Sequence, residues 1–214
     1  MELNSTIATT WLVMALCLGL GLGLTRRLGI VPMRAQTVAE AIVTAMRDAI
    51  GAVVPLERDL VFPFVATLWI FLVFANLIGI VPGLSSPTAD LSTTAALAVL
   101  TFLFVHYTGV RSVGIRTYLQ HYVKPNPIML PFEILTEISR TVTLAVRLFG
   151  NMMSLEMAAL IVVGLAGFLV PIPILMLHIV EALIQAYIFG MLALFYVASG
   201  VEIQHQRLQK GLTL

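Results

Sequence analysis

The sequence predicts an all-α membrane protein that forms a single domain over residues 1–214. Apolar residues make up 59% of the chain and charged residues only 11%, whereas an average soluble domain has about 25% charged residues. The mean hydropathy is +1.00, and several apolar runs reach the roughly 20 residues that a membrane helix needs. This composition excludes a soluble enzyme, a disordered tail and a nucleic-acid-binding module.

The first predicted membrane helix covers residues 7–24 and is followed by Arg26 and Arg27. A cleaved signal peptide is the alternative interpretation of this run. The positive charges of a signal peptide precede its apolar run, and here they follow it. We therefore expect a retained membrane helix.

Residues 28–59 mix charged residues with apolar ones that recur near helical spacing, among them Val38, Ile42 and Met46. This pattern predicts an amphipathic helix that lies on the membrane surface. A soluble loop with one helical turn is the alternative.

Four more membrane helices are predicted, over residues 60–81, 91–110, 128–169 and 174–205. The last two are separated by Pro171 and Pro173, which interrupt a helix. As one helix, residues 128–169 would extend for roughly 60 Å, about twice the 30 Å thickness of the apolar core of a bilayer. We therefore expect the last two helices to form a long, strongly tilted hairpin.

The charges of the connecting segments predict the orientation of the chain. Residues 25–59, residues 110–127 and the C-terminal tail all carry lysine or arginine, whereas residues 1–5, 82–90 and 168–173 carry none. Positive loops stay in the cytoplasm. The N-terminus is therefore predicted outside and the C-terminus in the cytoplasm, as an odd number of membrane helices requires.

Two of the predicted membrane helices carry stripes of polar side chains. The stripe on the fourth helix lies within roughly 40° of Arg147 at about 100° per residue and consists of Glu133, Arg140, Thr143, Asn151 and Ser154. Glu156 lies near the opposite side of that helix. The stripe on the fifth helix consists of His178, Glu181, Gln185 and Tyr196. Since an arginine in mid-membrane costs about 2.5–3.5 kcal/mol, these stripes favour an ion pathway over an internal ion-pair network.

The segment Arg-Leu-Phe-Gly-Asn-Met at residues 147–152 resembles a motif of subunit a of F-type ATP synthases. Three other stretches are also similar: Asn-Leu-Ile-Gly-Ile-Val-Pro at 76–82, Pro-Thr-Ala-Asp at 87–90, and Ala-Leu-Ile-Gln-Ala-Tyr-Ile-Phe at 182–189. The resemblance covers residues 5–205.

The resemblance implies roles for individual residues. Arg147 would face the ion-binding carboxylate of the rotating c-ring, with Gln185 across from it on the last helix. The residues implied in the outer half-channel are Asp90, Asn151, Glu156 and His178. Thr143 stands where bacterial members often have serine. Glu133 and Arg140 correspond to positions toward the cytoplasmic exit. We expect Arg140 to tune this exit by pairing with Glu133 or with Glu137, which lies within side-chain reach of Arg140 on a helix.

The resemblance also implies the partners and the transported ion. The chain would be a non-catalytic, ion-translocating subunit that needs no cofactor. It would contact the c-ring, the b subunits of the peripheral stalk and membrane lipid in the inner membrane of a bacterium, and no nucleic acid. The expected ion is H⁺ and the alternative is Na⁺. Glu181 departs from the family pattern as an extra acid beside His178, and we expect it to join Glu156 and His178 in the outer ion path. Glu156 and Glu181 would offer oxygen ligands to Na⁺.

Two other classes of function stay open at this point. The first is a secondary transporter whose Arg147 binds an anion, although the chain lacks the internal repeats of many such transporters. The second is a structural membrane scaffold, which the ionisable stripes disfavour. Copurification with a c-ring would separate the three.

Overall fold

The computed structural model describes residues 2–26, 34–55, 57–81, 84–115, 118, 130–166 and 172–211. Within these ranges the chain is helical and contains no strand, which confirms the predicted all-α class. The α-helices are α1 (Glu2–Thr25), α2 (Arg34–Val53), α3 (Arg58–Leu77), α4 (Leu91–Val113), α6 (Leu130–Ala166) and α7 (Ile172–Gly211). Two short 3₁₀ helices, η1 (Ile78–Ile80) and η2 (Pro87–Ala89), lie between α3 and α4.

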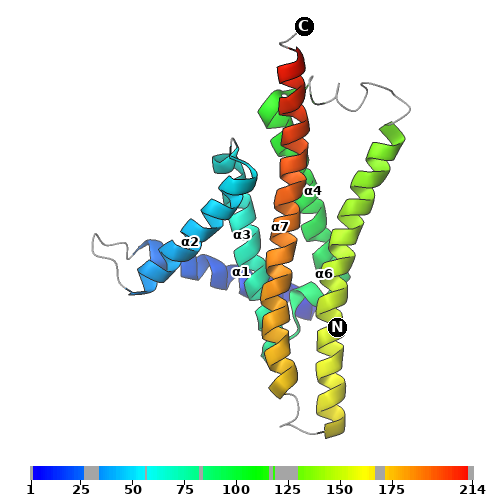
Figure 1. Cartoon of the computed structure of the whole chain (residues 1–214). Helices are drawn as coiled ribbons and strands as arrows, with labels where there is room; N and C mark the ends of the chain where they lie inside the picture. The colour runs from blue at the N-terminus through cyan, green and yellow to red at the C-terminus, as the bar shows by residue number, and fades with distance from the viewer. Residues whose placement is uncertain are drawn as a thin grey trace.

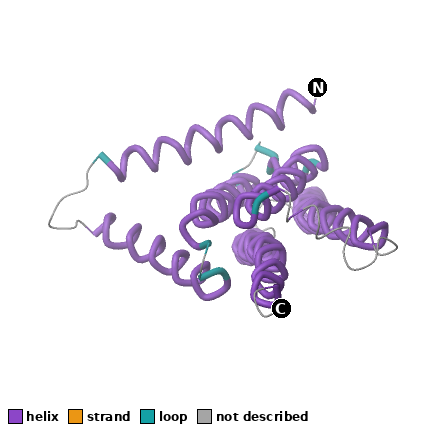
Figure 2. The backbone as a smooth tube through the Cα atoms, turned by 90° about the horizontal axis from the view of Figure 1, so that it is seen from above, coloured by secondary structure: helices purple, strands orange, loops and turns teal. Residues whose placement is uncertain are grey.

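The long helices α6 and α7 lie close together at the bottom of Figure 1 and diverge toward the top; α3 packs against α7, and α4 packs against both. With 37 and 40 residues α6 and α7 are the longest described elements, and each extends for about 55–60 Å. In Figure 1 the helix α1 crosses the direction of α6 and α7. Figure 2 agrees, since α1 is seen along its length there while α6 and α7 are seen nearly end-on.

Five of the described helices are long and apolar enough to cross a membrane, as the sequence predicts. They are the segments Thr6–Thr25, Arg58–Ile80, Leu91–Ser112, Leu130–Val162 and Leu175–Ser199. The remaining helix, α2, is the predicted amphipathic one. Some of its apolar side chains, such as Val38 and Ile42, are exposed, whereas Ile50 is fully buried.

The core lies where α3, α4, α6 and α7 meet. One cluster contains Leu72, Ala98, Leu148 and Phe189, which come from these four helices. A second cluster joins Ile50 of α2 to α3, α4 and α7. Many other large apolar side chains remain exposed, as is expected of helices whose outer faces contact lipid.

The helix α7 begins at Ile172, before Pro173, whereas the sequence predicts a start at residue 174. A proline is tolerated there because the first four N–H groups of a helix have no partner within it. The residues 167–171 that connect α6 to α7 lie outside the described ranges.

Gly190 allows α7 to approach α3 closely. A Cβ atom at this position would overlap the indole of Trp69, the nearest group. The Trp69 Nε1–H donates a hydrogen bond to the Tyr187 carbonyl at 3.3 Å, so the ring is held in place. The absence of a side chain at residue 190 thus sets the spacing between the two helices.

Candidate functional site

Arg147 lies on the outward face of α6, within the membrane-spanning segment Leu130–Val162. Leu144 and Leu148 on the inward face are buried in the core, whereas Arg147 and its neighbours Thr143 and Val146 are exposed. The 3.6-residue period of the helix separates these two sets. The positive charge is therefore presented to whatever covers this face within the membrane.

One turn further along α6, Asn151 contacts α7. Its Nδ2 donates to the Oε1 of Gln185 at 2.8 Å, so the structure brings together two of the residues that the sequence analysis selects. Gln185 is only 1% exposed, and its Nε2 has no hydrogen-bond partner among the described residues. A buried donor without a partner costs about 1–3 kcal/mol, which makes this group a ready donor to an incoming ligand or water.

A buried polar network connects α3, the segment before α4, α6 and α7. Glu156 Oε1 accepts a hydrogen bond from the Ser86 N–H at 2.9 Å. The hydroxyls of Ser86 and Thr88 are 2.7 Å apart, and Thr88 donates to Asn76 Oδ1 at 2.7 Å. The carbonyl of Asn76 lies 3.4 Å from His178 Nε2. Since a carbonyl only accepts, this nitrogen carries the proton.

The structure therefore connects Glu156 and His178 through three intermediate residues. The sequence analysis places Glu156, His178 and Glu181 together in one outer ion path. Glu181 is half-buried on the first half of α7, and no described hydrogen bond or ion pair joins it to His178. Within the described residues, no three His, Cys, Asp or Glu side chains gather as they would around a metal ion.

Asp90 caps the N-terminus of α4. Its Oδ1 accepts from the backbone N–H and the hydroxyl of Ser92, both at 2.8 Å. These two hydrogen bonds lower the pKa of Asp90 below its ordinary value of 3.8. Burial opposes them less strongly, and a hydrogen bond from Thr6 makes the smallest contribution, which also lowers the pKa. Asp90 also lines an open cavity of ≈ 310 Å³ between α1 and α4, together with Thr6, Thr10 and Trp11.

We expect Asp90→Ala to destabilise the chain by about 1 kcal/mol, because the first N–H groups of α4 lose their acceptor. Asp90→Asn should retain most of the stability. Since the folded-state pKa is lowered, the stabilisation by the carboxylate is complete above pH 3.8 and is lost as the pH falls below that value. Thermal unfolding of the detergent-solubilised complex measures the difference, and equal midpoints for the alanine and asparagine variants would contradict it.

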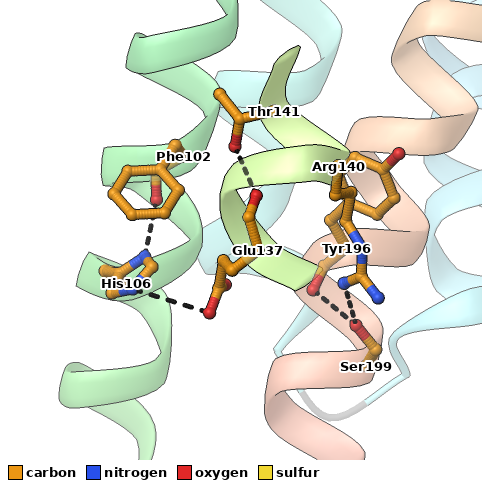
Figure 3. A network of polar contacts seen from close by, with 7 residues as sticks. All are labelled: Phe102, His106, Glu137, Arg140, Thr141, Tyr196 and Ser199. Atoms are coloured by element: carbon orange, nitrogen blue, oxygen red, sulfur yellow. Dashed lines mark hydrogen bonds and ion pairs between the residues drawn. The ribbon is translucent and has the colours of Figure 1, made fainter. Parts of the chain in front are cut away.

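A second polar cluster joins α4, α6 and α7 (Figure 3). The Arg140 guanidinium lies over the Tyr196 ring, 4.6 Å from its centroid, and Nη1 is 3.5 Å from Ser199 Oγ. Glu137 Oε2 lies 4.0 Å from His106 Nε2. Glu133, one turn before Glu137, is half-buried.

The sequence analysis predicts that Arg140 pairs with Glu133 or Glu137 along its own helix. In the structure Arg140 contacts Tyr196 and Ser199 of α7, and Glu137 lies near His106 of α4. A cavity of ≈ 10 Å³ between these three helices is lined by Glu137, Arg140 and Tyr196. This is about the volume that one water molecule requires.

Sequence reasoning missed five residues of these networks, namely Asn76, Ser86, Thr88, His106 and Ser199. Asn76 and Thr88 lie within the stretches that carry the family resemblance, so a signal existed for them. Ser86 and His106 give no such signal, because each acquires its partner only through packing between helices that are distant in the sequence.

Comparison with known proteins gives the family of the chain. Residues 7–198 match the family described as ATP synthase A chain. The chain is 53% identical over 210 residues to the ATP synthase subunit a of Legionella pneumophila strain Philadelphia 1, a match that covers 98% of this chain and 91% of the relative. It is 54% identical over 203 residues to ATP synthase subunit a 2 of Pelobacter propionicus, with coverage of 94% and 89%.

A third relative, ATP synthase subunit a 1 of Hahella chejuensis, is 52% identical over 202 residues, which cover 94% of this chain and 86% of the relative. The matched region contains Arg147, the Asn151–Gln185 pair and both polar networks. The chain is thus a multi-pass membrane protein that belongs to the ATP synthase A chain family.

Proposed function

We propose that this chain is the ion-translocating stator subunit of a rotary ATP synthase and that Arg147 separates two half-channels. The observation that carries the proposal is an exposed arginine in the middle of a membrane-spanning helix. Facing lipid, it would cost about 2.5–3.5 kcal/mol. A carboxylate on a partner in the membrane offsets this cost. Membership of the family favours this role over an independent secondary transporter or a scaffold.

The partner surface is the exposed flank of α6. Val142 and Val146, which precede and follow Thr143 in the sequence, are 54% and 53% exposed. This apolar face can pack against the apolar helices of a c-ring. Its one positive charge would then face the ionisable group with which the ring binds each ion. The b subunits and lipid would cover other exposed helices, such as α1.

Two polar networks lie on opposite sides of Arg147 along α6 and supply the half-channels. The network from Glu156 to His178 belongs to the outer one, with Asp90 and its open cavity at the entrance. The cluster around Glu137 and Arg140 belongs to the cytoplasmic one. This assignment follows the predicted orientation, with the N-terminus outside. If α1 stands upright in the membrane, the crossing seen in Figure 1 means that α6 and α7 are strongly tilted.

The mechanism uses charge rather than conformational change in this chain. An ion from the outer half-channel neutralises a c-ring carboxylate, whose transfer into lipid then becomes inexpensive. Near Arg147 the carboxylate prefers its ionised form, because the positive charge lowers its pKa. The same charge repels a cation that would leak directly between the half-channels. The membrane potential, about 2.3 kcal/mol per charge per 100 mV, then drives rotation.

Disulfide cross-linking tests the c-ring interface. In a Cys17→Ser background, Val146→Cys should form a disulfide with a cysteine placed beside the c-ring carboxylate. The matched control is Leu148→Cys, two residues away but fully buried in the core, which should not. An assembled complex in which neither variant cross-links, or in which both do so equally, would refute the proposed interface.

The proposed coupling ion is H⁺, with Na⁺ as the alternative. We expect ATP hydrolysis by the complex to be independent of Na⁺ at fixed pH and ATP synthesis to be abolished by a protonophore. Both are measured in membrane vesicles over a series of Na⁺ concentrations. Hydrolysis stimulated by Na⁺, together with synthesis that resists the protonophore, would establish Na⁺ coupling instead.

We expect Arg140→Ala to slow ATP synthesis by roughly tenfold without abolishing it. Arg140 lines the small cavity but already has contacts to Tyr196 and Ser199 within this chain, so it tunes the exit rather than meeting the c-ring. Exposed cation–π contacts contribute about 0.5–1 kcal/mol, which limits the structural damage. Initial synthesis rates in inverted vesicles check this. A complete loss would show that its role equals that of Arg147.

A further inference from the structure

We propose that His106 of α4 transfers protons between Glu137 and the cytoplasm and is thereby a further residue of the exit pathway. This inference rests on the proposed function, since it concerns the same half-channel. His106 lies outside the two polar stripes, and only the packing of α4 against α6 brings it to Glu137 (Figure 3). Both side chains are partly exposed, at 29% for His106 and 23% for Glu137.

The hydrogen bonds of the imidazole decide which nitrogen can accept a proton. His106 Nδ1 lies 2.9 Å from the Phe102 carbonyl. Because a carbonyl only accepts, Nδ1 carries the hydrogen in this contact. In the neutral ring the lone pair is then on Nε2, which is the nitrogen that faces Glu137 Oε2 at 4.0 Å.

Either a proton held by one of the two groups or a water that donates to both can join the Nε2 lone pair to the Glu137 carboxylate. A proton that reaches the carboxyl group of Glu137 therefore has an acceptor in Nε2 of His106. A distance of 4.0 Å is too long for a direct hydrogen bond. Transfer thus requires either one bridging water or a small approach of the two side chains.

The surroundings connect this pair to the rest of the exit. Glu137 lines the cavity of ≈ 10 Å³ that Arg140 and Tyr196 also line, so a water in this cavity would lie beside the carboxyl group. The ring of His106 packs against Phe102, with centroids 4.2 Å apart, and meets the Tyr118 ring edge-on at 5.9 Å. These rings hold the imidazole in one orientation.

The charged and titratable groups around the pair come from all the elements packed against it. Arg140 and Glu133 lie on α6, Tyr196 lies on α7, and Tyr118 follows α4. On α4 itself, Arg111 Nη1 lies 3.4 Å from the Tyr107 hydroxyl, one turn beyond the histidine.

The transfer step during ATP synthesis balances as follows. A c-ring carboxyl group gives its proton to the cavity water, which passes it to the Glu137 carboxylate. Glu137 then passes the proton to Nε2 of neutral His106, and the imidazolium releases it from Nε2 to cytoplasmic water. Both side chains return to their starting states, and one proton has crossed the exit.

Two variants of His106 distinguish proton transfer from packing. His106→Gln keeps an amide that can donate to the Phe102 carbonyl but cannot carry a proton between solvent and Glu137. His106→Ala removes both functions and leaves space for added imidazole. We expect each to lower ATP synthesis by the whole complex roughly tenfold, less than the about 10²–10⁴ typical of a lost acid–base group, because water still offers a slower path.

The readouts are the pH profile of synthesis and chemical rescue. Between about pH 5 and 8, where a histidine changes its charge, both variants should have a different profile from the unmodified complex. Added imidazole should restore synthesis several-fold in His106→Ala and leave His106→Gln unchanged. Full activity of His106→Gln, or loss in His106→Ala without rescue and without a changed pH profile, would overturn the inference. Coupling by Na⁺ would also overturn it, since this pair transfers only protons.

Arg147→Ala is measured in parallel, so that a failure of the proposed function can be distinguished from a failure of the role proposed for His106. If Arg147→Ala retains synthesis, the proposed function itself is wrong. If Arg147→Ala abolishes synthesis and His106→Gln behaves as the unmodified complex, only the role of His106 is refuted.

Discussion

Arg147→Ala is expected to abolish ion-driven ATP synthesis while the complex remains assembled. Its side chain is exposed, and the core of this region is made by Leu144 and Leu148, so alanine leaves the helix packing intact. The c-ring carboxylate, however, would lose the positive charge that favours its ionised form, and ions would leak between the half-channels. ATP synthesis in inverted vesicles and the subunit content of the purified complex measure the two effects.

Arg147→Lys tests whether charge alone suffices. We expect it to lose most of the activity, because the compact ammonium lacks the planar and permanently charged guanidinium. Leu160→Ala, at an exposed position of α6 outside the polar stripe, is the control and should keep most of the synthesis rate. Near-normal synthesis by Arg147→Ala would refute the proposed role of the arginine.

Gly190→Ala is expected to have the second-largest effect, and it acts through packing. The added methyl group would overlap the Trp69 indole, a rigid ring that is 6% exposed and hydrogen-bonded to α7. Overpacking of this kind costs about 1–3 kcal/mol, and here it also separates α3 from α7. Because Asn76 donates from α3 to the Ala182 carbonyl of α7 at 3.2 Å, the outer network would be disturbed as well.

The thermal midpoint of the solubilised complex and its content of this subunit measure the effect of Gly190→Ala. Gly164→Ala on α6 is the matched control, since an added Cβ meets nothing within 4 Å there. It should be neutral or slightly stabilising by helix propensity. The double variant Gly190→Ala/Trp69→Leu should recover part of the loss. An unchanged midpoint for Gly190→Ala would show that the two helices can separate without cost.

Several features of this protein could be predicted from its sequence because they depend on local chemistry. The apolar runs and their lengths predict the five membrane helices, since a helix satisfies its own backbone in lipid. The helical period predicts that Glu133, Arg140, Thr143, Asn151 and Ser154 share a stripe with Arg147, and none of these side chains is buried in the structure. The motif at residues 147–152 predicts the family, which the comparisons show.

The partners of the polar residues were decided only by the tertiary structure. Periodicity states which face of a helix a side chain occupies but not which helix covers that face. Arg140 therefore contacts Tyr196, 56 positions later in the chain, rather than only acids on its own helix. Likewise, Glu137 meets His106 of α4, and Glu156 meets the backbone of Ser86.

The physical reason is that buried polar groups must find hydrogen-bond partners wherever the packing of apolar surfaces leaves them. In this chain the close approach at Gly190 and the core between α3, α4, α6 and α7 set the positions of these helices. The sequence by itself thus determined the helices, their polar stripes and the family. The three-dimensional packing decided which residues form each network, and it alone brought His106 to the proposed exit.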